Sequence, residues 1–275
     1  MRIWAFDYVH TESVSLPYWR AKMAVTWHGI WYEIMRSKLL QELLLIPKGG
    51  QLAEPTAELH EAMLRLVEEI RFFRSYTQHI CISSSAGEVL MNIYQLPQRN
   101  VHVILNGVDE TKFTQYQEAG ARFREKHAVP SNASIVMGVA GRLVRDKGHP
   151  LLYEAFSSIV RRHPSVFLLV AGAGPWRRRY AELGPNVKIL GALEPFELSQ
   201  FYNALDVFVN PTLRPQGLDL TLIEAMHTGK PSFVEALELA IRDGSSVLKR
   251  KGLACKKYVV SMFAATKMAS AYERF

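Results

Sequence analysis

Two cations in the segment GRLVRDKG have the type and spacing to hold a diphosphate. Arg142 and Lys147 stand five positions apart, and Gly141 and Gly148 on either side allow the backbone to bend. An Arg guanidinium grips phosphate oxygens with a planar fork, and a Lys ammonium acts as a point charge. The alternative is an ordinary basic loop.

A second segment, RPQGLDLTLIEAM, could complete a nucleotide site. Gln216 lies eight residues before Glu224, and eight helical residues span roughly 12 Å, the reach of a nucleotide and its sugar. With a helix beginning near residue 218, the backbone N–H groups of Leu220 and Thr221 would point at a phosphate placed between them. Glu224 could accept hydrogen bonds from a ribose diol. Its alternative role is that of a surface residue on an amphipathic helix.

A third candidate is His28, which follows an apolar segment and precedes Gly29. A His in this place can face a cleft, although a single His is commonly structural. The segment AGAGP, residues 171–175, is only weakly similar to a phosphate loop. A tight turn into a helix with Pro175 in its first position explains it better.

The elements that would position these residues alternate between apolar strands and helices. Strands are expected at residues 22–29, 79–85, 101–109, 134–141, 165–172, 187–191 and 206–212. Helices are expected at residues 56–76, after a cap at Ser85, at 149–162, from 175, at 195–205, from about 218 to 227, and again from Ser232. This order predicts an α/β protein with two doubly wound parallel sheets, separated by a polar linker at residues 110–133. In such sheets ligands bind beyond the carboxyl ends of the strands, where the candidate residues fall.

Composition excludes several classes of protein. The chain has 275 residues, 48% hydrophobic and 21% charged, which is typical of a globular protein. No apolar run approaches the ~20 residues of a membrane span, and the N-terminus does not resemble a signal peptide. The net charge of +7 comes partly from basic clusters at residues 161–162, 177–179 and 249–251, all expected on helices. Solvated helix faces explain them better than nucleic-acid binding, which no other pattern supports.

The ordered set AGRLVRDKG, LLVAGAGP, DVFVNPT and QGLDLTLIEAMHTGKP resembles the nucleotide-sugar-binding half of retaining GT-B glycosyltransferases, family 4, of the glycosyl transferases group 1 type. VTWHGIWYE and VILNGVD are most similar to plant members. The resemblance implies a GT-B fold with two Rossmann-like domains, an N-terminal acceptor-side domain at residues 1–130 and a nucleotide-sugar domain at residues 131–275 that ends in a helix.

The resemblance also implies roles for individual residues. Arg142 and Lys147 would bind the diphosphate of a UDP- or GDP-linked sugar, Glu224 the ribose, and the backbone near Leu193 the base. His28 would face the transferred sugar. The family has a carboxylate where this chain has Gln216; an amide can hydrogen-bond a sugar hydroxyl but offers no negative charge to an oxocarbenium-like transition state. No metal or other cofactor is required.

Against the same family, the chain is expected to be truncated before Met1 and to lack a strand and loop between Pro231 and Ser232. That predicts a retaining transferase impaired in this form, acting on an acceptor that the sequence does not identify. The alternatives are a non-catalytic relative that binds a nucleotide or a partner and, with less support, a nucleic-acid-binding protein. The compartment expected is the cytoplasm, or the Golgi and endomembranes if a missing N-terminal segment carries an anchor.

Overall fold

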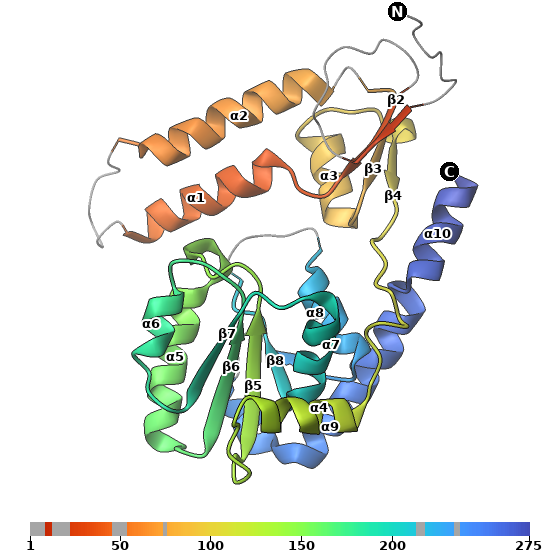
Figure 1. Cartoon of the computed structure of the whole chain (residues 1–275). Coiled ribbons are helices and arrows are strands. Elements are labelled where there is room, and N and C mark those ends of the chain that lie inside the picture. Colours follow the sequence, from red (N-terminus) through yellow and green to blue (C-terminus); the bar gives the residue numbers. More distant parts are fainter. Residues whose placement is uncertain (1–8, 13–22, 46–53, 74–75, 213–217, 234–236) are drawn as a thin grey trace, which may run out of the picture. The chain divides into compact units, whose positions relative to one another are not determined.

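The computed structural model describes residues 9–12, 23–45, 54–73, 76–212, 218–233 and 237–275 (Figure 1). The chain forms two compact units. Unit 1 comprises residues 1–106, 214–218 and 274–275, and unit 2 comprises residues 107–213 and 219–273. The structural boundary after Asn106 lies earlier than the boundary expected at residue 130. Residues 107–130 therefore belong with the second unit.

Unit 1 contains a four-stranded parallel sheet. Its strands are β1 (Val9–Thr11), β2 (Met23–Trp27), β3 (Gln78–Cys81) and β4 (Val101–Val103), paired in that order. The inward side chains of β2 are almost fully buried, as expected for a strand that packs on both faces. Because β2 ends at Trp27, its carboxyl end carries His28.

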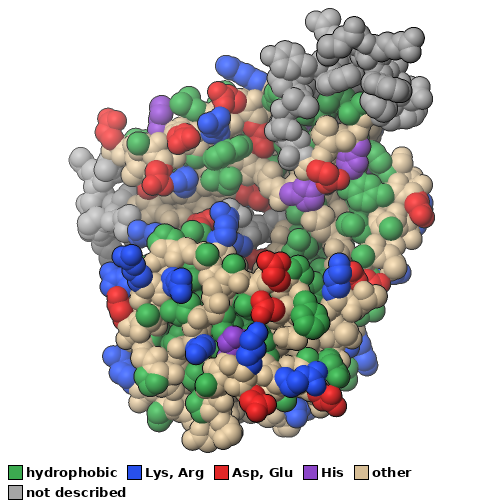
Figure 2. All heavy atoms as spheres, in the orientation of Figure 1, with side chains coloured by type: hydrophobic (Ala, Val, Ile, Leu, Met, Phe, Trp, Pro, Cys, Tyr) green, Lys and Arg blue, Asp and Glu red, His purple; other side chains and the backbone are tan. Residues whose placement is uncertain are grey.

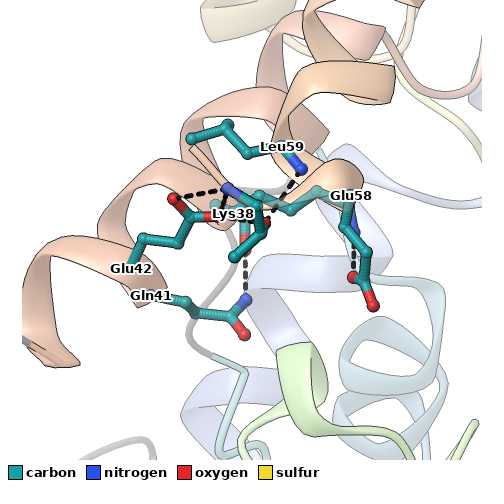
Figure 3. Close-up of polar contacts among 7 residues, drawn as sticks. Lys38, Gln41, Glu42, Glu58 and Leu59 are labelled. Atoms are coloured by element: carbon teal, nitrogen blue, oxygen red, sulfur yellow. Dashed lines mark hydrogen bonds and ion pairs between the residues drawn. The ribbon is translucent and has the colours of Figure 1, made fainter. Parts of the chain in front are cut away.

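Helices α1 (Trp31–Leu45) and α2 (Ala57–Phe73) pack against each other in unit 1. Thr56 caps α2, because its Oγ1 accepts a hydrogen bond from Leu59 N at 3.2 Å. The Thr56 hydroxyl in turn donates to Glu42 on α1. Lys38 on α1 pairs with Glu58 on α2 at 2.6 Å. Figure 3 shows these contacts, which fasten the start of α2 to α1.

Helix α3 (Ser84–Asn92) follows β3 and begins at a different cap from the expected one. Ser83, not Ser85, is the N-cap, and its Oγ accepts from Ala86 N at 3.1 Å. The prediction of Ser85 was wrong because β3 ends at Cys81, so the turn into the helix starts two residues earlier. A short 3₁₀ turn, η1 (Gln98–Asn100), precedes β4.

An aromatic cluster with one buried carboxyl forms the core of unit 1. Trp27 stacks on Phe73 with ring centroids 3.3 Å apart, and Tyr94 meets Phe73 edge-on at 4.7 Å. Glu69 on α2 accepts hydrogen bonds from Trp31 N at 2.6 Å and from the Tyr94 hydroxyl at 3.0 Å. Burial raises the pKa of Glu69 to about 7. The start of α1, three residues after His28, is thus anchored by a buried side chain.

Unit 2 contains a five-stranded parallel sheet in the order β7-β6-β5-β8-β9. Its strands are β5 (Ile135–Ala140), β6 (Val166–Ala171), β7 (Val187–Gly191), β8 (Val207–Val209) and β9 (Ser232–Phe233). The expectation that a helix starts at Ser232 was wrong, because Ser232 and Phe233 pair with Phe208 and Val209. Unpaired backbone groups at the edge of β8 favour pairing over helix formation at these two residues.

Helices cover both faces of this sheet. The helices that follow β4 in the chain are α4 (Gln117–Lys126), α5 (His149–Arg162), α6 (Arg177–Ala181), α7 (Pro195–Ala204), α8 (Leu220–His227), α9 (Leu237–Met262) and α10 (Ala265–Arg274), with a 3₁₀ turn η2 (Arg145–Lys147). Alternate residues of β5, β6 and β8 form one core with α5, α6 and α9. On the other face Phe208 packs on Tyr202 of α7, with ring centroids 5.5 Å apart. Figure 1 shows α5 and α6 on one side and α7 and α8 on the other.

Helix α4 lies in the segment expected to be a linker, and it docks on α7. A Cβ at Gly120 would come within 2.3 Å of Asn203 O, so only glycine fits there. Asn203 Oδ1 accepts from Tyr116 N at 2.7 Å, and Arg124 pairs with Asp206 at 3.1 Å. The linker prediction was wrong for residues 117–126, because small and apolar residues in this polar segment bury one face of a helix.

The basic clusters lie on helices, as the sequence predicts. They fall at the end of α5, on α6 and on α9. Figure 2 shows Lys and Arg side chains at many places over the described part of the face in view, with Asp, Glu and hydrophobic side chains between them. Among the described residues, none of the helices has both the length and the apolar character needed to cross a membrane.

Candidate functional site

A pocket of about 370 Å³ opens in unit 2 at the carboxyl ends of β5, β6 and β7. Its walls are mostly alanine and glycine backbone, with Arg142, Leu193, Leu198 and Thr221 as the larger side chains. A Cβ at Gly172 would lie 1.8 Å from Gly141 O, so the two loops approach at glycine only. Small residues let a ligand reach backbone N–H groups, as phosphate-binding loops require.

The loop after β5 carries both predicted phosphate-binding cations. The Arg142 side chain is exposed and lines the pocket, whereas Lys147 ends the η2 turn and is largely buried. Gly148 has a φ of 74°, and a Cβ there would meet Pro211 O at 1.7 Å. The loop can therefore turn into α5 only through a glycine.

A buried histidine fixes the backbone of this loop. His149 Nε2 lies 3.0 Å from Arg142 O, and its Nδ1 lies 2.8 Å from the Tyr180 hydroxyl. A carbonyl only accepts, so Nε2 carries the proton and Nδ1 accepts from Tyr180. Burial lowers the pKa of His149 to about 4, which keeps this neutral tautomer at physiological pH. The side chain thus joins the Arg142 loop to α6.

The N-terminus of α8 is capped by an aspartate that the sequence analysis did not single out. Asp219 Oδ1 accepts from Thr221 N at 3.2 Å and from its hydroxyl at 2.7 Å. Asp219 Oδ2 lies 3.2 Å from Lys147 Nζ and 3.1 Å from Asn210 Nδ2. In the structure the Thr221 N–H, expected to face a phosphate, already has this carboxylate as partner. Leu220, in the same turn, is 40% exposed.

The pKa values of Asp219 and Glu224 are shifted in opposite directions, although burial acts to raise both. Although burial acts to raise the pKa of Asp219, the charge of Lys147 and the hydrogen bonds outweigh it, and that pKa lies below its ordinary value. Glu224, on α8, accepts from the Tyr202 hydroxyl at 2.8 Å. Burial, aided by the charge of Asp219, raises the pKa of Glu224 to about 7. The hydrogen bond from Tyr202 on α7 thus fixes the orientation of the Glu224 carboxyl on α8.

Two further residues, His28 and Gln216, are predicted from the sequence. His28 is exposed in unit 1, where its Nε2 contacts Glu12 Oε2 at 2.8 Å and its Nδ1 contacts Asn106 Nδ2 at 3.4 Å. Gln216 lies outside the described residues. The structure therefore brings Arg142, Leu193 and Thr221 to one pocket.

Four residues that sequence reasoning missed complete the site. They are Asp219, Tyr202, His149 and Tyr180. For Asp219 a signal was present, since an aspartate directly before an apolar helical run is a preferred N-cap. The other three act through contacts between residues 22, 31 and 7 positions apart, which periodicity does not reveal.

Residues 134–269 match the family model described as Glycosyl transferases group 1. The matched region contains the pocket, the N-cap Asp219 and Glu224 on α8. It does not include His28.

Two curated proteins of similar sequence are both longer than this chain. A mannosylfructose-phosphate synthase of Agrobacterium fabrum is 27% identical over 185 residues, which cover 62% of this chain and 40% of the relative. An uncharacterized glycosyltransferase of Methanocaldococcus jannaschii is 31% identical over 198 residues, covering 69% and 48% respectively. The chain thus spans about half or less of the length of these relatives.

Solved structures share the fold of the chain. Anabaena Alr3699/HepE, solved in complex with UDP and glucose, superposes with a TM-score of 0.72 at 15% identity, covering 93% of this chain and 71% of that one. WaaG, a glycosyltransferase involved in lipopolysaccharide biosynthesis, gives 0.68 at 15% identity, covering 90% and 73%. These similarities show the GT-B fold.

Proposed function

Because the chain has the GT-B fold and residues 134–269 match the Glycosyl transferases group 1 family, we propose that it binds a nucleoside-diphosphate sugar and transfers the sugar to an acceptor. The observation that carries this proposal is the pocket at the carboxyl ends of β5, β6 and β7, with Arg142 on its wall and the start of α8 beside it. Cations and helix N-termini favour a diphosphate, and the pocket volume suits a nucleotide.

In the proposed complex the predicted site residues of unit 2 have separate roles. Arg142 and Lys147 hold the diphosphate and stabilise the charge that develops on it as the sugar leaves. Glu224, oriented by Tyr202, accepts hydrogen bonds from the ribose hydroxyls. The backbone near Leu193 lies against a uracil or guanine base.

The finer assignments come from the sequence resemblance. We propose that transfer proceeds with retention of the sugar's configuration, and that His28 and Gln216 position the sugar. Gln216 supplies a hydrogen bond and no charge, so the leaving diphosphate and its two cations provide most of the electrostatic stabilisation. The supports for this assignment are the residue types and their order along the chain.

Calorimetric titration of UDP, GDP, uridine and guanosine tests the proposal. Arg142→Ala should weaken diphosphate binding about 10- to 100-fold, since a hydrogen bond to a charged group contributes about 1.5 to 3 kcal/mol. Nucleoside binding should stay the same. The matched control is Arg161→Ala, which removes an exposed arginine at the far end of α5. Equal losses for nucleosides and diphosphates would exclude Arg142 from a phosphate site.

Sugar transfer is measured separately from binding. Donor hydrolysis and transfer from UDP- and GDP-linked sugars should depend on Arg142. Binding of a nucleoside diphosphate with no turnover on any donor would favour the non-catalytic relative instead.

A further inference from the structure

Asp219 places a negative charge among the groups proposed to hold the diphosphate. Its Oδ2 lies 3.2 Å from Lys147 Nζ, and the two side chains are only 11% and 18% exposed. Its Oδ1 accepts from Thr221, which lines the pocket. One of the two cations of the proposed phosphate site therefore already has a counter-charge, supplied by the protein itself.

The charges of this group set how strongly it attracts an anion. Arg142, Lys147 and an ionised Asp219 sum to one positive charge, where the two cations alone would give two. At low exposure, charges interact more strongly than in water, and the repulsion from Asp219 grows with each negative charge on the ligand. The carboxylate should therefore weaken ligands of higher charge more than ligands of lower charge.

Sugar transfer changes the charge of the nucleotide in the site. The bond between the anomeric carbon and the terminal phosphate oxygen breaks, and the electron pair stays with that oxygen. The acceptor hydroxyl oxygen forms the new bond to the anomeric carbon, and its proton is released to the solvent. Because a terminal phosphate group has a second pKa of about 6, the released nucleoside diphosphate carries one more negative charge than the donor at neutral pH.

We propose that Asp219 determines the selectivity of this site between the donor and the released nucleoside diphosphate, opposing the additional charge of the product and so favouring its release. This inference rests on the proposed function of unit 2. Asp219 acts here as a specificity-determining residue, and it need not contact the sugar or the acceptor.

The test compares the dissociation constants of UDP and UDP-glucose, and of GDP and GDP-mannose, at pH 7.5. Asp219→Asn removes the charge and keeps an oxygen that can accept from Thr221 N–H. We expect diphosphate affinity to rise about tenfold and donor affinity about threefold, so that the ratio shifts about threefold toward the product. Comparing ratios cancels the contacts of the sugar itself.

Two further variants separate charge from shape. Asp219→Ser is a second uncharged cap and should shift the ratio in the same direction. Asp206→Asn removes a carboxylate from another ion pair of unit 2, that with Arg124 at the amino end of β8, and should leave the ratio unchanged. Thermal melting of each variant verifies that it is folded.

Each outcome decides between the two proposals. If the wild-type chain binds nucleotides and both Asp219 variants keep its ratio, the role of Asp219 is refuted while the proposed function stands. A shift of equal size in Asp206→Asn would also refute it. If the folded wild-type chain binds none of the four ligands, both proposals fail.

Discussion

In unit 1 the buried carboxyl of Glu69 accepts hydrogen bonds from Trp31 N–H and the Tyr94 hydroxyl, and in unit 2 the buried imidazole of His149 joins Arg142 O to Tyr180. Burial favours the neutral form of both groups: it raises the pKa of Glu69 to about 7 and lowers the pKa of His149 to about 4. The two groups differ in what they hold. Glu69 fixes the start of a helix, and His149 fixes the loop that carries Arg142, the arginine proposed to bind the diphosphate.

This difference teaches where a buried polar group affects ligand binding. A partnered polar side chain in a core contributes to stability wherever it lies, because removing it leaves its partners unsatisfied. Only a group that holds a strand-end loop should also affect nucleotide affinity. Substitutions in the two units can therefore separate stability from binding.

The largest effect is expected for His149→Ala. The change leaves the Tyr180 hydroxyl without its partner, opens a cavity and frees the Arg142 backbone, at a cost of about 3 kcal/mol in the free energy of unfolding. Urea denaturation measures this cost, and calorimetry should show weaker binding of nucleoside diphosphates. Tyr180→Phe, which removes one hydroxyl, should cost about 1 kcal/mol. If folded His149→Ala kept its nucleotide affinity, the expected difference between His149 and Glu69 in their effect on binding would be refuted.

Glu69→Ala should cost about 2 kcal/mol, since Trp31 N–H and the Tyr94 hydroxyl both lose their acceptor. Nucleotide affinity should not change, because unit 2 supplies the proposed site. Glu68→Ala, at an exposed neighbouring position on the same helix, serves as the control for helix propensity. If Glu69→Ala weakened UDP or GDP binding while the protein stayed folded, the expectation that Glu69 affects stability and not nucleotide binding would be refuted.

Stability should also depend on pH through Glu224. Its pKa is about 7 in the folded chain against an ordinary value of 4.5, so the unfolded chain releases this proton first. The stabilisation is complete below about pH 4.5 and is lost as the pH rises through 7. Between pH 5 and pH 8 the wild type should therefore lose about 1 to 2 kcal/mol more than Glu224→Gln. Parallel pH profiles for the two proteins would contradict the raised pKa.

The smallest effect is expected for Tyr202→Phe. Loss of the hydroxyl leaves Glu224 less well oriented, which should weaken ribonucleotide binding about fivefold, or about 1 kcal/mol. The corresponding deoxyribonucleotide should lose less, because it offers one hydroxyl fewer. Calorimetry with UDP and 2′-deoxy-UDP provides the measurement. Equal losses of affinity for the two nucleotides would show that the Tyr202–Glu224 pair has no role in ribose binding.

The sequence predicts the long buried strands well, but it predicts the short strand β9 and the helix boundaries less well. Continuous apolar segments such as residues 166–171 are typical of strands buried on both faces, and they fold as expected. The sequence pattern does not predict helix α1, because its apolar residues are not confined to one face. Leu39, Leu40 and Leu43 are exposed. Among the three consecutive serines 83–85, local sequence does not select the cap; the end of β3 does.

For the candidate site, the sequence indicates which loops contribute residues, but it does not indicate which side chains of these loops contact one another. Arg142, Leu193 and Thr221 follow or precede predictable elements, and the topology of a parallel sheet brings such positions to one edge. The ion pair between Lys147 and Asp219 joins residues 72 positions apart. Such a pair depends on how closely two loops approach, which side-chain packing decides.

The docking of α4 on α7 has a consequence for how the chain is made. Tyr116 reaches its acceptor on Asn203 across 87 positions, so α4 leaves the ribosome well before the surface that receives it. Contacts between residues far apart in the sequence form slowly, because the chain loses the entropy of loop closure before the contact contributes favourable free energy. During synthesis, the α4 segment therefore emerges before its partner surface exists, and a helix of 10 residues is too short to be stable alone. We expect this segment to be among the last to become protected as the protein folds.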